Sequence, residues 1–524
     1  MTEKLANYIG GAWVEGAGAG TALVDPVLGT ELVRASTAGL DYRAGLEHAR
    51  TVGGPALRAL SYAERAALVG KIADVLAANR EDYYRIALEN SGNTATDAQS
   101  DIDGGIFTLR SFARAGAALG EGRYLLDGPI TSLSKDGTFA AVHLAQPLRG
   151  VAVHINAFNF PSWGLWEKAG PTLLSGVPIF AKPATATSWL TQRMVKDVVE
   201  AGILPDGALS VVCGSAGDLL DHLQVGDVVS FTGSADTGMK IRGNPTVLHN
   251  NCRVNIEADS LNSTVLGPDA TPGAAEFDLL VKEVVREMTH KAGQKCTAIR
   301  RIIVPAGIAG DVADAVAARL AKTTVGNPRT EGVRMGPVVS LDQKRSCEEG
   351  LAALRSEAAV VYAGGDGFAP VDADPEVSAF LPPTLLSCAD PDAAQAVHDV
   401  EVFGPASTIL PYRDPEHAFA LAARGLGSLA SSVFSGDAAF IEAASLALAG
   451  RHGRVLNVNK SVGSLSTGHG NVMPQCIHGG PGRAGGGEEL GGLRALRFYH
   501  QLAAIQGPLP RLEALAAGGA TLSY

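Results

Sequence analysis

The sequence predicts an α/β protein with two α/β regions and a small β arm, and three observations lead to this. Between residues 146 and 261, short apolar segments alternate with segments of helix length. A second alternation of the same kind runs from residue 262 to about residue 470. Just before the first one, Lys135-Asp-Gly137 separates two segments of β type. Alternating strands and helices form parallel sheets, and an Asp-Gly pair between strands is typical of a hairpin.

The elements of the first region follow from apolar spacing and from the residues that end each segment. Residues 163–174, for example, form an apolar segment of helix length that Ser175-Gly-Val-Pro178 ends. Strands are expected at residues 148–155, 179–182, 208–212, 227–232 and 254–256, and helices at residues 163–174, 188–201 and 218–223. Residues 55–120 are expected to be helical, with the clearest pattern at residues 63–79.

The second region is expected to begin with a helix over residues 277–288, where apolar residues recur every three or four positions. A β-branched run at residues 302–304 predicts the next strand, and further helices are expected at residues 310–321 and 415–424. The hairpin strands are expected at residues 130–134 and 138–144. The glycine-rich residues 16–20 and 479–492 are expected to be loops, and residues 493–501 a strand.

Composition narrows the class of protein. The chain has 524 residues, enough for two or three domains, and its 43 basic and 54 acidic residues give a net charge of −11. This balance argues against a broad nucleic-acid surface. No apolar leader and no apolar run of about 18 residues occurs, so we expect a cytoplasmic protein that does not enter membranes. The six cysteines lack metal or disulfide spacing, so neither a metal site nor a disulfide framework is expected.

Cys296 is a candidate nucleophile. It lies in His290-Lys-Ala-Gly-Gln-Lys-Cys-Thr-Ala-Ile-Arg300, between the helix at residues 277–288 and the strand at residues 302–304. Loops of this kind often carry catalytic residues. Lys291 and Lys295 flank the thiol, and nearby cations favour the reactive thiolate. A buried, inert cysteine is the alternative interpretation.

A nucleotide cofactor is expected at the carboxyl ends of the first region's strands. The usual glycine fingerprint is absent there, and Gly480-Pro-Gly482-Arg-Ala-Gly485, which follows no predicted strand, is interpreted as a chance match. The strand at residues 227–232 instead runs into Gly233 and Ser234, where a helix start would direct N–H groups at a phosphate. An ordinary strand-to-helix turn is the alternative.

Five motifs resemble those of the aldehyde dehydrogenase superfamily, in the same order along the chain. They are Asn156-Ala-Phe-Asn-Phe-Pro161, Lys182-Pro183, Phe231-Thr-Gly-Ser234, Gly293-Gln-Lys-Cys296 and Glu401-Val-Phe-Gly-Pro405. Three further stretches, at residues 257–262, 285–289 and 478–492, resemble a narrower branch that oxidises acyl-CoA semialdehydes in aromatic acid degradation. The resemblance implies the aldehyde dehydrogenase fold, with a Rossmann-like cofactor domain, a second α/β catalytic domain and a β oligomerisation arm.

The resemblance assigns four catalytic residues. Cys296 would attack the aldehyde as thiolate, and Asn159 would donate to the resulting oxyanion. Glu257 would activate the water that hydrolyses the thioester, although the Glu-Leu-Gly-Gly usual in the family is Glu257-Ala-Asp-Ser here. Lys168 would tune that base or relay a proton. Without the resemblance, Asn159 is a turn residue, Glu257 a solvated strand end and Lys168 a surface lysine.

The resemblance also assigns the cofactor site, through Ile155, Asn156, Phe158, Lys182, Thr185, Gly233, Ser234, Glu401 and Phe403. Lys182 would contact the adenosine ribose, and Glu401 and Phe403 would position the nicotinamide half. Members that prefer NAD commonly place a glutamate where this chain has Thr185. A hydroxyl can donate to a 2′-phosphate that a carboxylate would repel, so NADP is expected over NAD.

The branch resemblance implies 3,4-dehydroadipyl-CoA semialdehyde as the substrate, with Arg483 as one candidate for its phosphates and Glu488 and Glu489 as candidates for ordering the active site. A homodimer or a dimer of dimers is expected. The expected dinucleotide-binding domain is residues 1–129 and 146–261, the catalytic domain residues 262–478, and the oligomerisation segments residues 130–145 and 479–524. Oxidation of another aliphatic aldehyde, a CoA-acylating reaction and an inactive member of the fold stay as alternatives.

Overall fold

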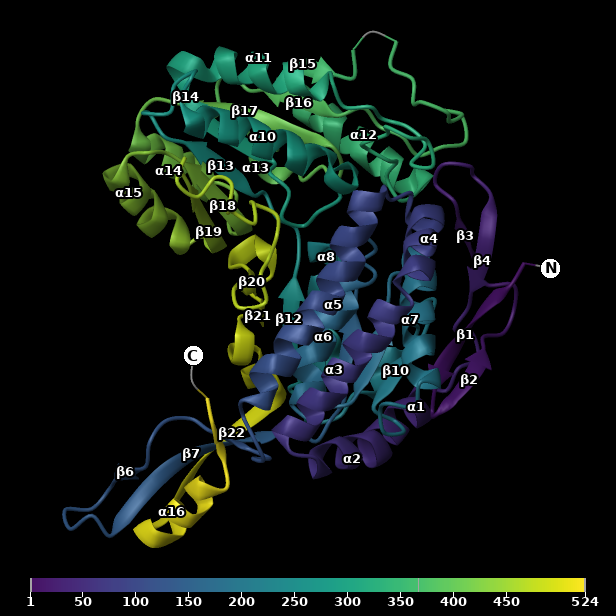
Figure 1. The fold of residues 1–524 in the computed structure, drawn as a ribbon, viewed down its shortest axis with the longest axis vertical. Coiled ribbons are helices and arrows are strands. Elements are labelled where there is room, and N and C mark those ends of the chain that lie inside the picture. The colour runs from purple at the N-terminus through teal and green to yellow at the C-terminus, as the bar shows by residue number, and fades with distance from the viewer. Residues whose placement is uncertain (1, 366, 523–524) are drawn as a thin grey trace.

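The computed structural model describes residues 2–365 and 367–522, and its first sheet is built mainly from the first half of the chain (Figure 1). The strand order is β12-β11-β8-β9-β10-β1-β4-β3, with β2 paired to β1. The strands are β1 (Lys4–Ile9), β2 (Ala12–Glu15), β3 (Thr21–Val24), β4 (Glu31–Ala35), β8 (Ala152–Ile155), β9 (Ile179–Lys182), β10 (Leu209–Val211), β11 (Val228–Thr232) and β12 (Arg253–Glu257). Strands β8 to β12 are parallel, as the alternation predicts.

Helices cover both faces of this sheet because successive residues of its strands point to opposite faces and apolar side chains lie on both. On β9, Ile179 and Ala181 pack with the helices of one face, and Phe180 packs in a separate cluster on the other. The helices are α1 (Tyr42–His48), α2 (Gly54–Ala59), α3 (Tyr62–Ala78), α4 (Arg80–Ser91), α5 (Ala95–Ala117), α6 (Trp163–Leu174), α7 (Ser188–Glu200), α8 (Ala235–Arg242) and α9 (Pro245–His249), with a π-helical turn at Ala49–Gly53 and 3₁₀ turns at Thr185–Thr187 and Leu219–His222.

The second sheet has the order β15-β16-β17-β14-β13-β18-β19, and only β15 runs antiparallel to its neighbour among the described strands. Its strands are β13 (Ser263–Leu266), β14 (Arg301–Pro305), β15 (Ala359–Ala363), β16 (Thr384–Ser387), β17 (Ala406–Tyr412), β18 (Ser428–Phe434) and β19 (His452–Val458). Its helices are α10 (Ala275–Thr289), α11 (Ala309–Leu320), α12 (Leu341–Arg355), α13 (Ala396–Asp399), α14 (Pro415–Ala423) and α15 (Ala438–Ala449), with 3₁₀ turns at His290–Gly293 and Ala306–Ile308.

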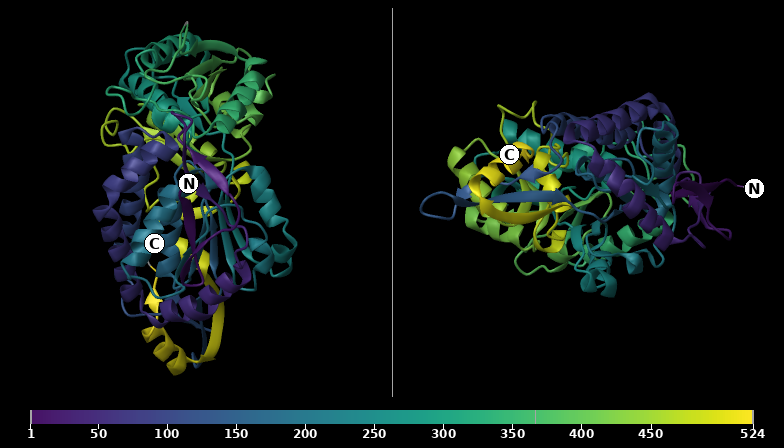
Figure 2. Two further views of the ribbon diagram at one scale, coloured as in Figure 1. Left: turned by 90° about the vertical axis from the view of Figure 1, so that its right-hand side faces the viewer. Right: turned by 90° about the horizontal axis from the view of Figure 1, so that it is seen from below.

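A β arm projects from the body, and it stands away from both sheets in Figure 1 and in the left-hand view of Figure 2. Its order is β22-β7-β5-β23, with β6 paired to β7. The elements are β5 (Leu125–Leu126), β6 (Thr131–Ser132), β7 (Phe139–Pro147), β22 (His500–Pro508), α16 (Leu509–Ala517) and β23 (Ala520–Thr521). The predicted hairpin is therefore present, and the C-terminal strand of the same chain pairs with it along its length.

Three expectations about local structure are wrong. The strand expected from residue 148 begins at Ala152, because Asp227 takes the N–H of Val151 out of the strand pairing. Residues 493–501 form mainly a 3₁₀ helix, Gly492–Tyr499, since Leu496 and Tyr499 are buried at a three-residue spacing.

Residues 479–492, expected to be a loop, contribute to a small hairpin of β20 (Ile477–Gly479) and β21 (Glu488–Leu490), with a 3₁₀ turn at Gly482–Ala484. The glycines permit close backbone approach there: a Cβ on Gly479 would lie 2.0 Å from the carbonyl oxygen of Gly487. The four N-terminal strands were not expected at all. Within the described residues, no helix has both the length and the apolar character that crossing a membrane requires.

Candidate active site

The carboxyl edge of the first sheet gathers most of the residues expected to form the site. The chain passes from β8 to β9 and β10 on one side and places β11 and β12 on the other, so the strand order reverses between β8 and β11. Ligands bind at such reversals in parallel sheets. Ile155 is paired with Lys182, and Thr232 with Glu257, so all four lie at this edge.

The loop with Cys296 lies between α10 and β14, as predicted, and is held by polar contacts. The backbone of Lys291, Ala292 and Gly293 has positive φ, and a Cβ on Gly293 would lie 2.2 Å from the carbonyl oxygen of Gly404. The amide of Asn262 donates to the carbonyl oxygen of Cys296 at 2.8 Å. These contacts hold the half-buried thiol at the wall of a cavity that Asn159, Glu257 and His478 also line.

The cavity brings together the thiol, two carboxylates, an imidazole and an amide. Cys296 Sγ lies 3.8 Å from His478 Nε2, and the same nitrogen lies 3.4 Å from Glu257 Oε1. His478 Nδ1 lies 3.4 Å from Glu167 Oε2. Asn159 lines the same cavity. A thiol with acid–base groups and an amide donor around it is an arrangement suited to covalent catalysis.

Behind the cavity lies a buried ion-pair network. Lys168 Nζ is 3.3 Å from Glu167 Oε1 and 3.1 Å from Glu489 Oε2. Glu489 Oε1 accepts hydrogen bonds from Ser230 Oγ at 2.6 Å and from Asn255 Nδ2 at 2.9 Å. Lys168 is therefore a buried lysine and not a surface one, and the Glu489 side chain points toward the site. Glu488 is exposed, and Arg483 donates to the carbonyl oxygen of Asp399 at 2.5 Å.

The charges in this cluster shift one another's pKa values. Burial opposes ionisation of Glu257, but the adjacent His478 and Lys168 bring the pKa of Glu257 down to about 2. Burial opposes protonation of His478, yet Glu257, Cys296 and Glu167 raise the pKa of His478 well above its ordinary value. Burial and Glu257 raise the pKa of Cys296 to about 12, while His478 acts in the opposite direction. The resting site is thus an imidazolium between carboxylates, beside a thiol.

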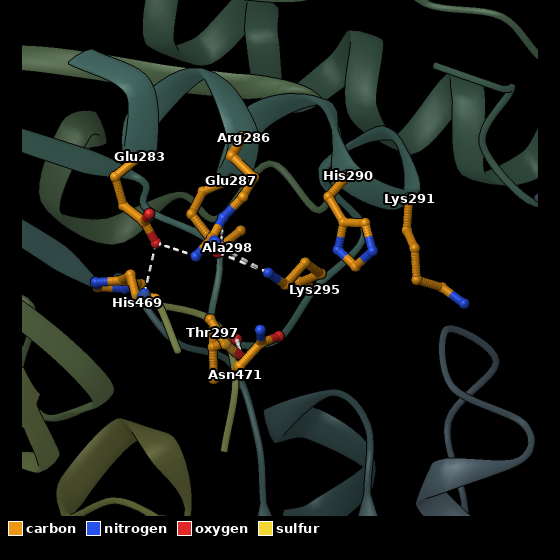
Figure 3. A network of polar contacts seen from close by, with 12 residues as sticks. Glu283, Arg286, Glu287, His290, Lys291, Lys295, Thr297, Ala298, His469 and Asn471 are labelled. Carbon is orange, nitrogen blue, oxygen red and sulfur yellow. Dashed lines mark hydrogen bonds and ion pairs between the residues drawn. The ribbon is translucent and has the colours of Figure 1, made fainter. Parts of the chain in front are cut away.

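Lys291 and Lys295 do not supply the cation beside the sulfur, which corrects an expectation from the sequence. Lys295 Nζ lies 2.7 and 2.8 Å from the carboxylate oxygens of Glu287 on α10 (Figure 3). Lys291 Nζ lies 4.5 Å from the ring centroid of Phe160 and 3.9 Å from Asp101. The group beside Cys296 Sγ that carries a positive charge is His478.

The loop after Glu257 departs from the family's pattern and is well fixed here. Asp259 Oδ1 accepts from the N–H of Ala235, the first residue of α8, and Ser260 donates its N–H to Glu401 Oε2. The glycine-rich match at residues 480–485 packs against this strand end: the N–H of Ala258 donates to the carbonyl oxygen of Ala484. That match is therefore no phosphate loop.

Buried polar atoms without a hydrogen-bond partner lie at the sheet edge. They are both side-chain amide atoms of Asn156, an expected cofactor residue, and the hydroxyl of Thr232, which was given no role from the sequence. Oε1 of Glu401 has no hydrogen-bond partner either, but it lies 3.5 Å from Arg300 Nε. A Cβ on Gly233 would lie 2.5 Å from the ring of Phe231. Ser234 accepts from the N–H of Thr237 and caps α8, as expected. Groups of this kind need a ligand or water to complete their hydrogen bonds.

The other cofactor candidates lie around the same edge. The rings of Phe158 and Phe403 meet edge to face at 5.7 Å. Burial raises the pKa of Glu401 to about 7, against the nearby Arg300. Thr185 begins a 3₁₀ turn just after Lys182, and both side chains are half-buried.

Two residues of the cluster, Glu167 and His478, were given no role from the sequence. The sequence did mark Glu167 as unusual, because Glu167 and Lys168 are the only charged residues of a helix whose other residues are apolar or small. His478 stood within a glycine-rich stretch, and only the fold shows that β20 carries it to the thiol. Glu257, Cys296 and His478 have ligand atoms within 4.8 Å of one another. A nucleophilic thiol must keep its sulfur free, so we interpret the cluster as acid–base machinery.

The chain is similar to known proteins over most of its length. The family model described as aldehyde dehydrogenase family matches residues 13–505. A 3,4-dehydroadipyl-CoA semialdehyde dehydrogenase of Aromatoleum evansii is 60% identical over 478 residues, which are 91% of this chain and 93% of that protein. The succinate-semialdehyde dehydrogenase (NADP(+)) of Escherichia coli is 27% identical over 419 residues, 79% of this chain and 82% of that protein.

Among solved structures, a betaine aldehyde dehydrogenase from Staphylococcus aureus in complex with NAD+ superimposes with a TM-score of 0.81. It is 25% identical and the match covers 96% of this chain and 94% of that chain.

Proposed function

The chain belongs to the aldehyde dehydrogenase family, and we propose that it oxidises an acyl-CoA semialdehyde to the carboxylic acid with NADP as the hydride acceptor. The observation that carries the substrate class is the 60% identity, over nine-tenths of both chains, to a 3,4-dehydroadipyl-CoA semialdehyde dehydrogenase. That compound is our first candidate substrate, in the degradation of aromatic acids. An NAD(P)-dependent oxidoreductase acting on a semialdehyde is what the family and this relative establish.

We assign the first chemical step to Cys296. Its thiolate attacks the aldehyde carbon, the S–C bond forms, and the carbonyl electron pair moves to oxygen. Asn159 lines the cavity beside the thiol, so its amide is placed to donate to that oxyanion. The oxyanion then collapses with loss of hydride and leaves a thioester on Cys296.

Glu257 is the base of the second step. It is ionised at neutral pH, because its pKa is about 2, and it lies at the same cavity as Cys296. Glu257 takes a proton from water as the water oxygen attacks the thioester carbon. The S–C bond then breaks and its electron pair returns to sulfur. Lys168 contacts Glu167 and Glu489, and its ammonium compensates the negative charge of these carboxylates next to the base.

The residues at the sheet edge fit a nicotinamide dinucleotide. The side-chain polar atoms of Asn156 and Thr232 are buried without hydrogen-bond partners where the strand order reverses. Gly233 has no side chain, so the space beside the Phe231 ring stays open. When bound, the nicotinamide accepts the hydride from the substrate carbon. Asn156, Lys182, Gly233 and the other residues named from the sequence would hold it, with Phe158 packed against Phe403.

NADP is preferred in this proposal because Thr185, at the end of the edge next to Lys182, has no charge to repel a 2′-phosphate. One similar protein is named for NADP(+), and the solved structure cited above contains NAD+. Similar proteins are thus associated with NADP or with NAD, and a threonine at position 185 supports NADP for this chain.

We further propose that residues 1–129 and 146–261 bind the dinucleotide, that residues 262–478 complete the catalytic half, and that residues 130–145 and 479–524 mediate a homodimer or dimer of dimers. The division follows the two large sheets and the arm. On the arm, β22 lies at the sheet edge, and its Leu502 and Ile505 are exposed. Exposed apolar side chains on an unpaired edge suit a second copy of the chain.

Assay of purified enzyme with NADP on 3,4-dehydroadipyl-CoA semialdehyde and on free aliphatic semialdehydes tests the proposal. We expect the CoA-linked aldehyde to have a kcat/KM at least tenfold higher, and turnover without added CoA. An absolute requirement for free CoA would instead show an acylating reaction, against which Glu257 speaks. Equal rates on free aldehydes would contradict the substrate class.

A further inference from the structure

An imidazole lies beside the Cys296 sulfur in the described structure, and the proposed steps above make no use of it. His478 Nε2 lies 3.8 Å from Cys296 Sγ, within hydrogen-bonding range for sulfur. Its side chain is buried, about 10% exposed. A buried titratable group in contact with the nucleophile calls for a role in the chemistry.

His478 is held in one orientation from its other side. Its Nδ1 lies 3.4 Å from Glu167 Oε2, and β20 fixes its backbone, because His478 is paired with Glu489 on β21. Nucleophile, imidazole and orienting carboxylate thus follow one another as Cys296, His478 and Glu167. This is the order of contacts in enzymes that activate a nucleophile through a histidine, and here it is formed by three separate segments.

The charges around the sulfur explain why a cation is needed there. Glu257 on β12, Glu167 on α6 and Glu489 on β21 bring three carboxylates to the cluster, and Lys168 on α6 brings one ammonium. A thiolate would add a fourth negative charge. Arg454 on β19 also feels the charge of Cys296, but its guanidinium donates to the carbonyl oxygens of His469 and Asn471.

We propose that His478 is a catalytic residue, whose imidazolium, oriented by Glu167, stabilises the Cys296 thiolate both when it attacks the aldehyde and when it leaves the acyl group. In the first step the thiol proton passes to water, and the Nε2–H of His478 donates to Sγ. In the last step the S–C electron pair returns to sulfur, and the same N–H donates a hydrogen bond to the thiolate that forms. Glu257, whose Oε1 lies 3.4 Å from Nε2, takes the proton of the hydrolytic water.

The raised pKa of His478 supports this role, since it keeps the ring protonated across neutral pH. Glu257 and His478 act on Cys296 with opposite signs: the carboxylate raises the pKa of the thiol and the imidazole lowers it. Replacing Glu257 should therefore increase the reactivity of Cys296, and replacing His478 should decrease it.

The inference rests on the proposed role of Cys296 as nucleophile, and its test uses neither aldehyde nor cofactor. The rate of alkylation of Cys296 by iodoacetamide is measured from pH 5.5 to 10, with the Cys296 peptide quantified by mass spectrometry. Below the pKa of the thiol this rate is proportional to the fraction of thiolate. We therefore expect His478→Gln to lower the rate at least tenfold at each pH, as a rise of one unit in the pKa of Cys296 would do. Glu257→Gln should increase the rate.

Glu167→Gln keeps the imidazole but removes its orienting acceptor, so it should slow the alkylation by less than His478→Gln does. It also keeps the proposal testable if the His478 variant folds poorly. His222→Gln is the matched control, because His222 pairs with Asp218 at 2.8 Å outside the cavity. An alkylation rate that is unchanged or higher in both His478→Gln and Glu167→Gln would overturn the inference. Activity that survives Cys296→Ala would instead overturn the proposed function.

Discussion

The ammonium of Lys168 lies 3.1 Å from Glu489 Oε2, and both side chains are less than a tenth exposed. The pair joins α6 to β21, two elements more than 300 residues apart in the sequence. It also places a positive charge directly behind Glu167, which contacts the active-site imidazole.

This ion pair predicts that Lys168 and Glu489 contribute to the free energy of unfolding in a strongly coupled way. Lys168→Met should lower the free energy of unfolding by about 3 kcal/mol or more, because it leaves buried carboxylates without their counter-charge. The double variant Lys168→Met/Glu489→Gln should recover part of that loss. Urea unfolding followed by tryptophan fluorescence measures both, and additive effects of the two single changes would contradict the coupling.

A second prediction concerns Glu401 and pH. Burial raises the pKa of Glu401 to about 7 in the folded protein. Between the ordinary pKa of a glutamate and pH 7, the carboxyl is therefore protonated in the folded protein and ionised in the unfolded chain. Glu401 therefore reduces stability as pH rises through this window. Glu401→Gln should stabilise the protein at pH 8, by at most about 3 kcal/mol, and have little effect at pH 4.5.

Thermal unfolding at the two pH values measures this difference. Arg300 keeps hydrogen bonds to three backbone carbonyls in the variant, so the loss of its carboxylate partner should not mask the effect. A Glu401→Gln protein that is less stable than the parent at pH 8 would show that the Arg300 contact outweighs burial.

Coenzyme preference should depend on residue 185. Thr185→Glu introduces a carboxylate that repels a 2′-phosphate and can accept from ribose hydroxyls, so kcat/KM with NADP should fall at least tenfold while that with NAD rises. Thr185→Ser keeps the hydroxyl and should keep the preference. If the parent enzyme already uses NAD equally well, the argument from Thr185 is wrong.

Assembly should depend on the exposed apolar residues of β22. Leu502→Lys and Ile505→Lys place charge on the outer surface of the arm and should reduce the mass in light scattering toward the 53.9 kDa of one chain. Leu446→Lys, the same change at an exposed leucine on α15 away from the arm, serves as the control and should leave the assembly intact (Figure 1). A parent protein that is already monomeric would contradict the proposed role of the arm.

Sequence periodicity was enough to predict the parallel strands β8 to β12 of the first sheet and the helices α6 and α7 between them. The helix at residues 163–174 and the strand at residues 179–182 have the predicted bounds, since apolar spacing and a Ser-Gly-Val-Pro end mark them locally. The β20–β21 hairpin was missed because its glycines allow close backbone approach without the β-branched residues that signal a strand.

The site was predictable only as far as motifs reach. Cys296, Glu257 and Asn159 share one cavity, as the family resemblance implies. The cation beside the sulfur was assigned to the neighbouring lysines, whereas the fold turns Lys295 toward Glu287 and brings His478 from a distant hairpin. Proximity in sequence does not fix the direction of a long side chain in a loop with positive φ.

The central claim is that Cys296 carries the acyl group between oxidation and hydrolysis. Glu257→Gln should stop hydrolysis after one turnover, so incubation with 3,4-dehydroadipyl-CoA semialdehyde and NADP should trap the thioester. Mass spectrometry of the digested variant is then the most direct test. We predict the mass of the acyl-CoA group on the Cys296 peptide; an unmodified Cys296, or an adduct on another cysteine, would contradict the account.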